Sequence, residues 1–366
     1  MRSIKVSVIV PIYNAQPFLR QALTSLAKQN LSEMQVICIN DGSTDNSLDI
    51  IKEFVEQDSR FVVIDKENEG YGATCNKGLL AATGDYVSVF EPDDWIEGQM
   101  FNELLEFAES FGSSQRIDVI KSAYTRIVNP DTPQQKRYNC SYKNRKLPKK
   151  QPYTIDKHAH LISHHPSIWT ALYNREFLLE NNIKFREYQG SGWADNPFLI
   201  ETLCRAKNII YMDKAFYCYR EETDDKANNF SRANSTLPLE RWLLMLDLIE
   251  EIGIADEGIL KAHYSRGFTY LSGVLQACEF DDDLRDITGK MFDRMDSDIV
   301  LSDATVPNDM KRMFIKMRGL ENVKFKKLPY IYSLAEQFFY SVSNNGPGFA
   351  FSLVSRFAEK VSRRSE

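Results

Sequence analysis

The chain has 366 residues, of which 43% are hydrophobic, and its formal net charge is −6 at pH 7. This length can bury a substantial core and accommodate two or three domains. The acidic balance argues against a general nucleic-acid-binding protein, because such a protein needs a basic surface to contact phosphates.

The first hundred residues alternate between two hydrophobic periodicities. Short runs rich in valine and isoleucine predict strands buried on both faces, at residues 5–10, 35–40, 61–65 and 86–90. Between them, apolar residues at three- and four-residue spacing predict amphipathic helices at 18–27 and 48–55. Parallel strands joined by helical crossovers form a doubly wound sheet, so the pattern favours an α/β fold with a mostly parallel sheet flanked by helices.

Short polar stretches follow the first and second of these strands. PIYN, residues 11–14, follows the first strand, and NDGSTDNS, residues 40–47, follows the second. In doubly wound sheets, ligands bind beyond the carboxyl ends of the strands, so both stretches are candidates for a binding site. Taken alone, a turn that caps the next helix is the simpler interpretation of NDGSTDNS.

The fourth strand is followed at once by three carboxylates, Glu91, Asp93 and Asp94. Carboxylates this close repel one another and resist desolvation unless water, a cation or a cationic partner compensates them. One interpretation is a site for Mg²⁺ or Mn²⁺, with phosphate oxygens and water as the remaining ligands. A solvated turn that begins the next helix is the other, and the residue chemistry alone does not decide between them.

Residues 68–86 contain four glycines. They match neither the Walker pattern nor GxGxxG, so they predict only tight backbone turns. Lys77, within this stretch, is a candidate for contact with a phosphate, and a solvated lysine is the alternative.

The middle of the chain predicts a helix at 100–112, a strand at 118–128, and two further strands around NIIYM and FYCYR, residues 208–212 and 216–220. Asp195 follows two glycines in SGWADNPF. A carboxylate presented from such a loop is a candidate general base, and an aspartate that begins a helix is the alternative.

These patterns predict three parts. We expect residues 1–115 and 116–235 to form the two halves of the α/β part, the second with a basic surface loop at 129–157. From residue 236 to 366 the pattern is helical almost throughout.

The last residues combine an apolar face with basic side chains. Phe351, Val354, Phe357, Ala358 and Val361 recur at helical spacing, with arginines and lysines among them. The pattern suits either a helix on a membrane surface or a helix docked on the protein or a second copy.

Cysteine usage and the N-terminus point to the cytoplasm. The six cysteines are widely spaced and form no CxxC pair, which predicts reduced thiols without a zinc ribbon or a disulfide framework. The first residues have neither a cleavage site nor a long apolar run, so we expect a cytoplasmic protein, with contact to the inner face of the membrane as an open alternative.

Taken together, the stretches VSVIVPIYN, NDGSTDNS, NKGLLAATGDYV, EPDDW, WTALYNREFL and ADNPF resemble the family 2 glycosyltransferases, an inverting group with a GT-A fold. Each stretch is weak alone, but they occur in the family's order and rough spacing over residues 6 to about 220. The remaining C-terminal residues are not covered by the resemblance.

The resemblance implies that residues 1–115 form a nucleotide-sugar-binding half, with a nucleotide pocket, and that residues 116–235 form an acceptor-side half. In the family, the PxYN turn and the aspartate of the DGS segment line this pocket, which implies that the base and ribose contact Pro11, Tyr13, Asn14 and Asp41. Where relatives often carry an arginine in the ARNxG motif, this chain has Cys75, which removes one possible nucleotide contact.

The resemblance also implies a metal and a base. The family's acidic motif, usually D-x-D-D, implies Asp93 as a ligand of Mn²⁺ or Mg²⁺, with Glu91 and Asp94 beside it. Glu91 stands where the family has its first aspartate. The family's second acidic motif, usually ED, implies Asp195 as the base, with Ala194 in place of the glutamate.

These roles imply transfer of a sugar from a nucleotide-diphospho-sugar, by the resemblance a UDP-sugar, to a hydroxyl of a saccharide or lipid-linked saccharide. The expected setting is assembly of a surface polysaccharide or glycolipid. The departures at Glu91, Cys75 and Ala194 motivate the alternative of a non-catalytic nucleotide-sugar binder or scaffold in a transferase complex.

Overall fold

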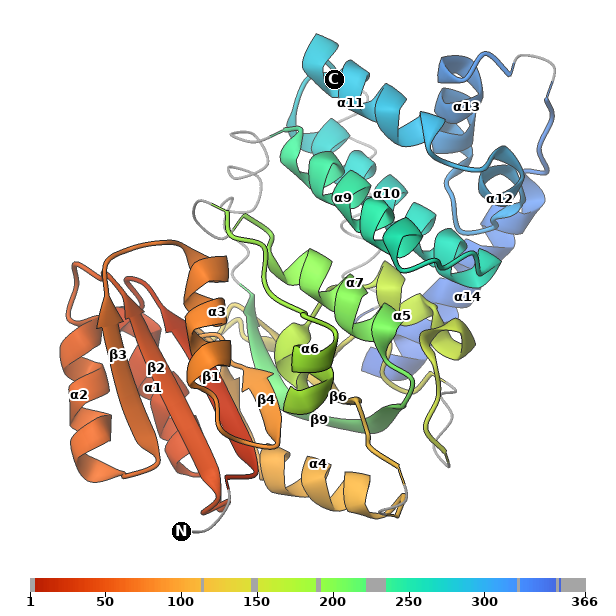
Figure 1. Ribbon diagram of the computed structural model, residues 1–366. Helices are drawn as coiled ribbons and strands as arrows, with labels where there is room; N and C mark the ends of the chain where they lie inside the picture. The colour runs from red at the N-terminus through yellow and green to blue at the C-terminus, as the bar shows by residue number, and fades with distance from the viewer. Residues whose placement is uncertain are drawn as a thin grey trace.

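One mixed sheet runs through the first 221 residues (Figure 1). The computed structural model describes residues 4–112, 115–145, 151–188, 192–221, 235–320, 323–346 and 349. Within them, nine strands pair in the order β3-β2-β1-β4-β8-β6-β9-β5, and β7 pairs with β6. The strands are β1 (Val6–Ile12), β2 (Met34–Asp41), β3 (Phe61–Lys66), β4 (Tyr86–Val89), β5 (Trp95–Ile96), β6 (Val119–Val128), β7 (Lys136–Asn139), β8 (Ala171–Asn174) and β9 (Ile209–Glu221).

The first four strands are parallel and are joined by helices, so the predicted doubly wound, mostly parallel α/β sheet is confirmed. The crossovers are α1 (Gln16–Ala27), α2 (Ser47–Gln57) and α3 (Tyr71–Ala81), and α4 (Met100–Glu109) follows β5. Every residue of β1 is buried, because helices cover both faces of the sheet there. β1 pairs with β2 on one side and β4 on the other, which creates the switch point where doubly wound sheets bind ligands.

Helix α3 occupies most of the stretch for which the glycines predict only turns. The glycines instead allow close packing: a Cβ at Gly72 would lie 2.1 Å from the carbonyl oxygen of Arg186, and one at Gly78 would lie 2.4 Å from Ile9. Asn76 stabilises the contact between α3 and this segment. Its side chain donates to the carbonyl of Phe185 at 2.9 Å and accepts from the backbone amide of Phe185 at 2.9 Å. Two of the four glycines, Gly72 and Gly78, are therefore packing positions on a helix, while Gly70, with φ at 91°, precedes the helix in a conformation that favours glycine.

Two other predictions need correction. The segments 208–212 and 216–220 belong to one strand, β9, which stays paired with β6 through a register irregularity at Ser122–Tyr124. Residues 136–139 of the predicted basic loop form β7, because the edge of β6 offers unpaired backbone groups. Residues 146–150 of that loop lie outside the described residues.

The C-terminal part is helical, as predicted. It consists of α9 (Leu237–Glu251), α10 (Glu257–Ala277), α11 (Asp282–Asp293), α12 (Ser297–Ser302), α13 (Asn308–Met317) and α14 (Leu328–Asn345). Before it lie the short elements η1 (Ile155–His158), α5 (His160–Ser163), η2 (Ile168–Thr170) and α6 (Arg175–Glu180), and then α7 (Asp195–Arg205). α9 packs on α7 and α10 packs on α5, so the helical part is joined to the sheet domain (Figure 1).

Among the described helices, none is both long and apolar enough to cross a bilayer. The six cysteines, which all lie in the described residues, form no disulfide bond with one another. The basic segment 351–364 lies outside the described residues.

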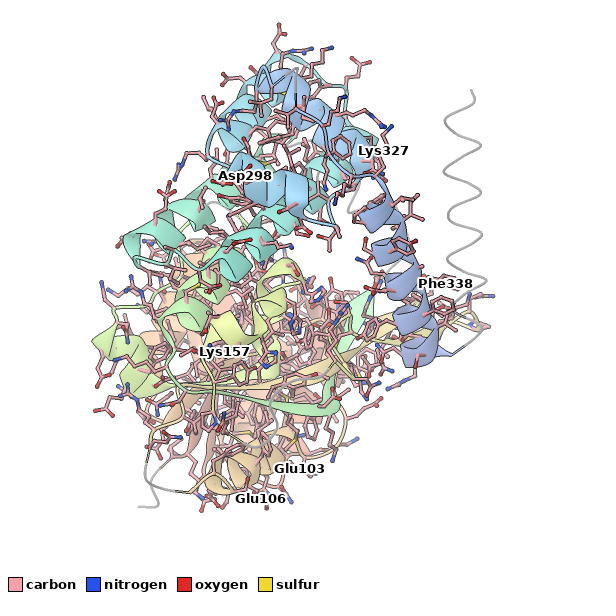
Figure 2. The ribbon with its side chains drawn as sticks, turned by 90° about the vertical axis from the view of Figure 1, so that its right-hand side faces the viewer. Glu103, Glu106, Lys157, Asp298, Lys327 and Phe338 are labelled. Atoms are coloured by element: carbon pink, nitrogen blue, oxygen red, sulfur yellow. The ribbon has the colours of Figure 1, made fainter. Side chains whose placement is uncertain are left out.

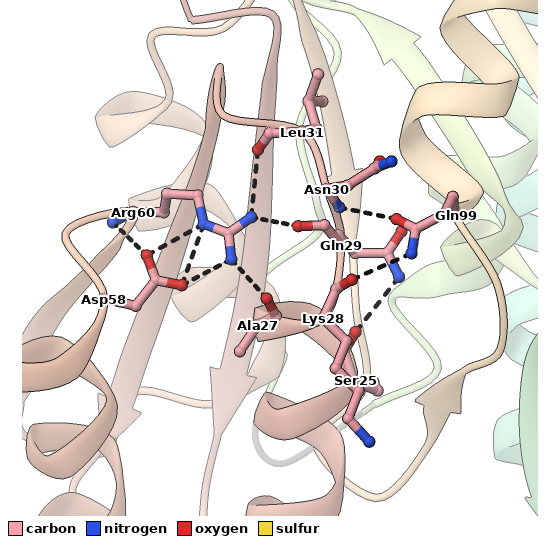
Figure 3. A network of polar contacts seen from close by, with 9 residues as sticks. All are labelled: Ser25, Ala27, Lys28, Gln29, Asn30, Leu31, Asp58, Arg60 and Gln99. Carbon is pink, nitrogen blue, oxygen red and sulfur yellow. Dashed lines mark hydrogen bonds and ion pairs between the residues drawn. The ribbon is translucent and has the colours of Figure 1, made fainter.

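Arg60, at the start of β3, fixes the end of α1 (Figure 3). Its guanidinium donates to the carbonyls of Ala27, at 2.6 Å, and of Gln29 and Leu31, and its partner Asp58 holds it in place. The last carbonyls of a helix have no partner within the helix, and a cation there is favourable. Because α1 begins at the switch point, this network anchors the helix at its far end.

Candidate active site

A cavity of about 570 Å³ opens at the carboxyl ends of β1, β2 and β4. Its lining comes from the segments that follow these strands and from the first turns of α1 and α3. The lining residues are Pro11, Ile12, Tyr13, Asn14, Ala15, Phe18, Asp41, Asn68, Gly70, Tyr71, Thr74, Glu91, Pro92 and Asp93. Six of the sequence-predicted site residues are thus brought to one cavity, although they lie up to about eighty positions apart in the chain.

Asn14 joins the turns that follow β1 and β2. Its backbone is in the left-handed region, with φ at 49°. Its side-chain oxygen accepts from the amide of Thr44 at 2.8 Å, and its own amide donates to Ser43 Oγ at 3.0 Å. Tyr13, which is 54% exposed, stands beside it on the cavity wall. An exposed aromatic ring next to polar groups can stack on the flat face of a base.

Asp41 is buried at the end of β2, and its carboxylate holds the segment that precedes α3. Its carboxylate accepts from the amides of Glu69 at 2.9 Å and Gly70 at 3.0 Å, and it pairs with Lys66. Asn68 donates to its carbonyl at 2.9 Å. The segment before α3 is therefore shaped around this single carboxylate, which places Asn68 and Gly70 in the wall.

Glu91 reaches the cavity from the end of β4. Its Oε1 accepts a hydrogen bond of 2.6 Å from the hydroxyl of Tyr71, and its amide donates to the hydroxyl of Tyr217. Burial, together with the negative charges of Asp93 and Asp195, raises the pKa of the Glu91 carboxyl to about 8. The ionised form of Glu91 therefore needs positive charge from a ligand or an ion.

The other two carboxylates of the acidic run, residues 91–94, point to different places. Asp93 is exposed and lines the cavity. Asp94 is buried, does not line the cavity, and accepts from the amide of Arg220 in β9 at 2.7 Å. Burial raises the pKa of the Asp94 carboxyl well above its usual range. Asp94 thus pairs the acidic run with β9, while Glu91 and Asp93 face the cavity.

Arg220 holds the acidic run from behind, and nothing in the sequence motifs singles it out. Its guanidinium donates to the carbonyl of Asp93 at 2.8 Å, to Asp131 at 2.8 Å and to Gln21 at 2.6 Å. It also lies over the ring of Phe18, whose side chain lines the cavity. One arginine thereby connects β9, α1 and the acidic run.

Asp195 is the first residue of α7, and its neighbour Asn196 donates to it at 3.0 Å. It is not among the residues that line the cavity, but its charge acts on Glu91 and Tyr71, so the three groups are near one another. Burial raises the pKa of the Asp195 carboxyl, and the positive charge of Arg266 opposes this rise. A carboxyl with a raised pKa is better suited to accept a proton than an ordinary one.

Two residues of α3 stand apart from the cavity lining. Lys77 is exposed on the helix. Cys75 is fully buried, and burial raises the pKa of its thiol well above the usual range.

Tyr71 lines the cavity but was not predicted from the sequence. A tyrosine beside a glycine forms no recognisable motif, and only the fold places its hydroxyl against Glu91.

The carboxylates of the cavity fit one particular kind of metal site. No group of three or more histidine, cysteine, aspartate or glutamate side chains in the described parts of the chain could hold a metal ion by itself. Glu91 and Asp93 instead fit an ion that takes one or two carboxylates from the protein and its other ligands from a diphosphate and water. A cation there would also stabilise the ionised form of Glu91, since the neighbouring charges are negative.

The sequence matches known proteins over this part of the chain. A model of the family described as Glycosyl transferase family 2 matches residues 7–178. EpsJ of Bacillus subtilis, an uncharacterized glycosyltransferase, is 32% identical over 228 residues, which cover 59% of this chain and 61% of EpsJ. EpsH of the same organism, a putative glycosyltransferase, is 41% identical over 108 residues, 30% of this chain and 31% of EpsH. The chain therefore spans less than two thirds of the length of these relatives.

A solved structure shares the fold. The crystal structure of S. aureus TarS 1-349 in complex with UDP aligns with a TM-score of 0.66 at 22% identity, over 86% of this chain and 87% of that one. At this identity the likeness shows the architecture, which is the GT-A arrangement of sheet and helices. Residues 7–178, just under half of the chain, thus match the model of Glycosyl transferase family 2, and the sheet has the GT-A fold.

Proposed function

We propose that this protein is a glycosyltransferase, which moves a sugar from a UDP-sugar to a hydroxyl of a saccharide or lipid-linked saccharide, with inversion at the anomeric carbon. The observation that carries the proposal is the cavity at the switch point, which is lined by Tyr13, Asn14 and Asp41 after β1 and β2 and by Glu91 and Asp93 after β4. The first group suits a nucleoside, and the two carboxylates suit a cation bound to a diphosphate. The structural neighbour TarS has been solved with UDP and with UDP-GlcNAc, which supports a uridine nucleotide.

In this proposal Asp93 holds Mn²⁺ or Mg²⁺, with Glu91 as a second ligand. The ion would offset the negative charge that develops on the departing diphosphate. Asp94 has a supporting role, because its carboxylate is directed to β9. Lys77, exposed on α3, would reach a phosphate only outside the described cavity.

Asp195 takes the proton from the acceptor hydroxyl as the hydroxyl oxygen attacks the anomeric carbon. The new bond forms on the face opposite the bond to the diphosphate, so a single displacement inverts the configuration. An α-linked donor would therefore give a β-glycoside. We propose that the acceptor belongs to a surface polysaccharide or glycolipid, and that the enzyme works in the cytoplasm, where nucleotide sugars are made.

Calorimetry with UDP, in the presence and absence of Mn²⁺, tests the donor site. Binding should require the ion and should be lost in Asp93→Ala, since this change removes the exposed carboxylate of the cavity. The Leu80→Ala variant, altered at an exposed site of α3 outside the cavity, is the control and should bind as the wild type does. Unchanged UDP affinity in Asp93→Ala would remove the metal role from this residue.

Asp195→Asn tests the chemistry. It should bind UDP normally and abolish sugar transfer from a UDP-sugar to a saccharide acceptor. If the wild type binds UDP-sugars but transfers none across a panel of acceptors, the alternative of a non-catalytic binder or scaffold is favoured. The replacement of the family's glutamate by Ala194 and of its arginine by Cys75 motivates that alternative.

A further inference from the structure

Helix α14 presents a broad apolar face to solvent. Six of its large apolar side chains are between 39% and 70% exposed, namely Leu328, Ile331, Tyr332, Leu334, Phe338 and Phe339. They recur at three- and four-residue spacing, so they share one side of the helix. A continuous exposed apolar surface of this kind marks a site for a partner or a membrane.

The opposite side of α14 attaches the helix to the rest of the protein. Successive residues of an α-helix are turned by about 100°, which brings Ser333, Tyr340 and Asn344 to the side away from the apolar face. Ser333 donates to the carbonyl of Ala304 at 2.8 Å, and Asn344 donates to the carbonyl of Cys140 at 3.2 Å. Tyr340 donates to the carbonyl of Lys143. These contacts hold the apolar face outward.

Figure 2 shows this arrangement. α14 runs along the edge of the molecule, with Lys327 at its start, and the side chain of Phe338 projects away from the body. Hydrogen bonds thus attach the helix to the rest of the protein at two places, Ala304 and the segment 140–143.

Positive charge gathers at the same end of the chain. Lys324, Lys326 and Lys327 are all exposed directly before α14. Residues 311–366 contain 11 lysines and arginines against 4 aspartates and glutamates, whereas the preceding 310 residues contain 34 against 47. An anionic surface would attract this end and repel the remainder, which defines one orientation of approach.

We propose that α14 lies in the interface of an anionic lipid membrane, with its apolar face among the acyl chains and Lys324, Lys326 and Lys327 at the head groups. An apolar face flanked by lysines, with tyrosine at its border, is the composition of an interfacial helix. This inference does not depend on the assignment of Asp93 or Asp195.

Flotation of the full chain with vesicles tests the proposal. The protein should float with vesicles of phosphatidylcholine and phosphatidylglycerol, but not with phosphatidylcholine alone, and added salt should weaken the binding. The double variant Tyr332→Asp/Phe339→Asp should lower the partition coefficient roughly tenfold or more. Lys326→Gln/Lys327→Gln should lower it roughly fivefold for each lysine removed.

Matched controls show whether loss of flotation is specific to the apolar face of α14 or follows from placing a charge at any exposed apolar residue. Leu80→Asp and Leu179→Asp change leucines that are exposed on α3 and α6, and both should float as the wild type does. UDP binding and the thermal midpoint, which should be retained in every variant, report whether the fold is intact. The proposal fails if the wild type does not float with anionic vesicles, or if the α14 variants float as well as the controls. A dimer in size-exclusion chromatography that Phe339→Asp dissociates, without vesicle binding, would assign the face to a second copy instead.

Discussion

Arg266 in α10 donates a hydrogen bond of 2.6 Å to the side-chain oxygen of Asn196, the neighbour of Asp195. Tyr270 donates to the same oxygen at 2.7 Å, and Arg266 also donates to the carbonyl of Ile162 at 2.7 Å. The guanidinium is almost fully buried. A helix outside the region that the family model matches thus fixes the first turn of α7, where the proposed base lies.

Arg266→Met should therefore reduce sugar transfer much more than UDP binding, by roughly 10²-fold in kcat, because a misplaced base loses its alignment. The charge of Arg266 lowers the pKa of Asp195, so its loss should raise that pKa. Asp195 must be ionised to accept a proton, and the acid limb of the kcat profile should consequently move to higher pH. The other groups on which the charge of Asp195 acts keep their side chains in this variant, but Tyr270 loses the hydrogen bond that Arg266 Nε donates to its hydroxyl. These groups are Tyr71, Cys75, Glu91, Tyr173 and Tyr270.

Arg266→Lys and Tyr270→Phe are the controls for this prediction. Both keep a positive charge at position 266, so the acid limb should stay near that of the wild type even where kcat falls. A lower kcat with an unchanged pH profile in Arg266→Met would limit Arg266 to a geometric role.

Glu91→Gln should stabilise the ligand-free protein at alkaline pH. Burial raises the pKa of Glu91 from 4.5 to about 8. Between these pH values the carboxyl ionises in the unfolded state but stays mostly protonated in the folded state, so the free energy of unfolding falls as the pH rises. At pH 8 the effect is at most about 5 kcal/mol, reduced because solvent reaches this partly exposed group. Below pH 4.5 the carboxyl is protonated in both states, and the two proteins should be equally stable.

Urea unfolding from pH 4 to 8.5 measures the difference in stability between Glu91→Gln and the wild type. Repeating it with UDP and Mn²⁺ tests whether the Glu91 charge is the cause. UDP with Mn²⁺ should remove the advantage of Glu91→Gln, since a bound cation stabilises the ionised glutamate. Equal stability of the two ligand-free proteins at pH 8 would show that the Glu91 charge is already compensated.

Gly72→Ala should destabilise the protein by roughly 1–3 kcal/mol, since the new methyl group would overlap the backbone of Arg186 at 2.1 Å. The shift of α3 should also weaken UDP binding, because Tyr71 and Gly70 line the cavity. Thermal unfolding and calorimetry measure the two effects. Gly273→Ala is the matched control: it lies in α10 with open space around it, so it should stabilise by roughly 0.5–1 kcal/mol. A Gly72→Ala protein as stable as the wild type would exclude this tight contact.

Arg220→Met should lower the free energy of unfolding by roughly 1–3 kcal/mol, because the arginine side chain, which is 6% exposed, loses its hydrogen bonds to Asp93, Asp131 and Gln21. It should also weaken Mn²⁺-dependent UDP binding, since the carbonyl of Asp93 loses its support. Urea denaturation and calorimetry report the two effects. Arg20→Met, which breaks an exposed pair with Glu53, should change neither. Normal UDP affinity in Arg220→Met would show that the acidic run keeps its conformation without this arginine.

The amino-acid sequence by itself determined the parallel half of the sheet. β1 to β4 and their crossover helices are local patterns, because burial on both faces requires continuous apolar strands and burial on one face requires a helical period. The turns after β1, β2 and β4 follow from this order. The sequence alone therefore predicts one edge of the sheet for five site residues, namely Tyr13, Asn14, Asp41, Glu91 and Asp93.

Only the tertiary structure decided which carboxylate faces the cavity and what surrounds it. Asp93 and Asp94 are adjacent and chemically alike, yet one lines the cavity and the other pairs with β9. Tyr71, Arg220 and Arg266 acquire their roles from contacts with residues 20, 127 and 70 positions away. Such pairings depend on how whole elements pack against each other, and hydrophobic periodicity, which reports only which side of an element is buried, carries no information about them.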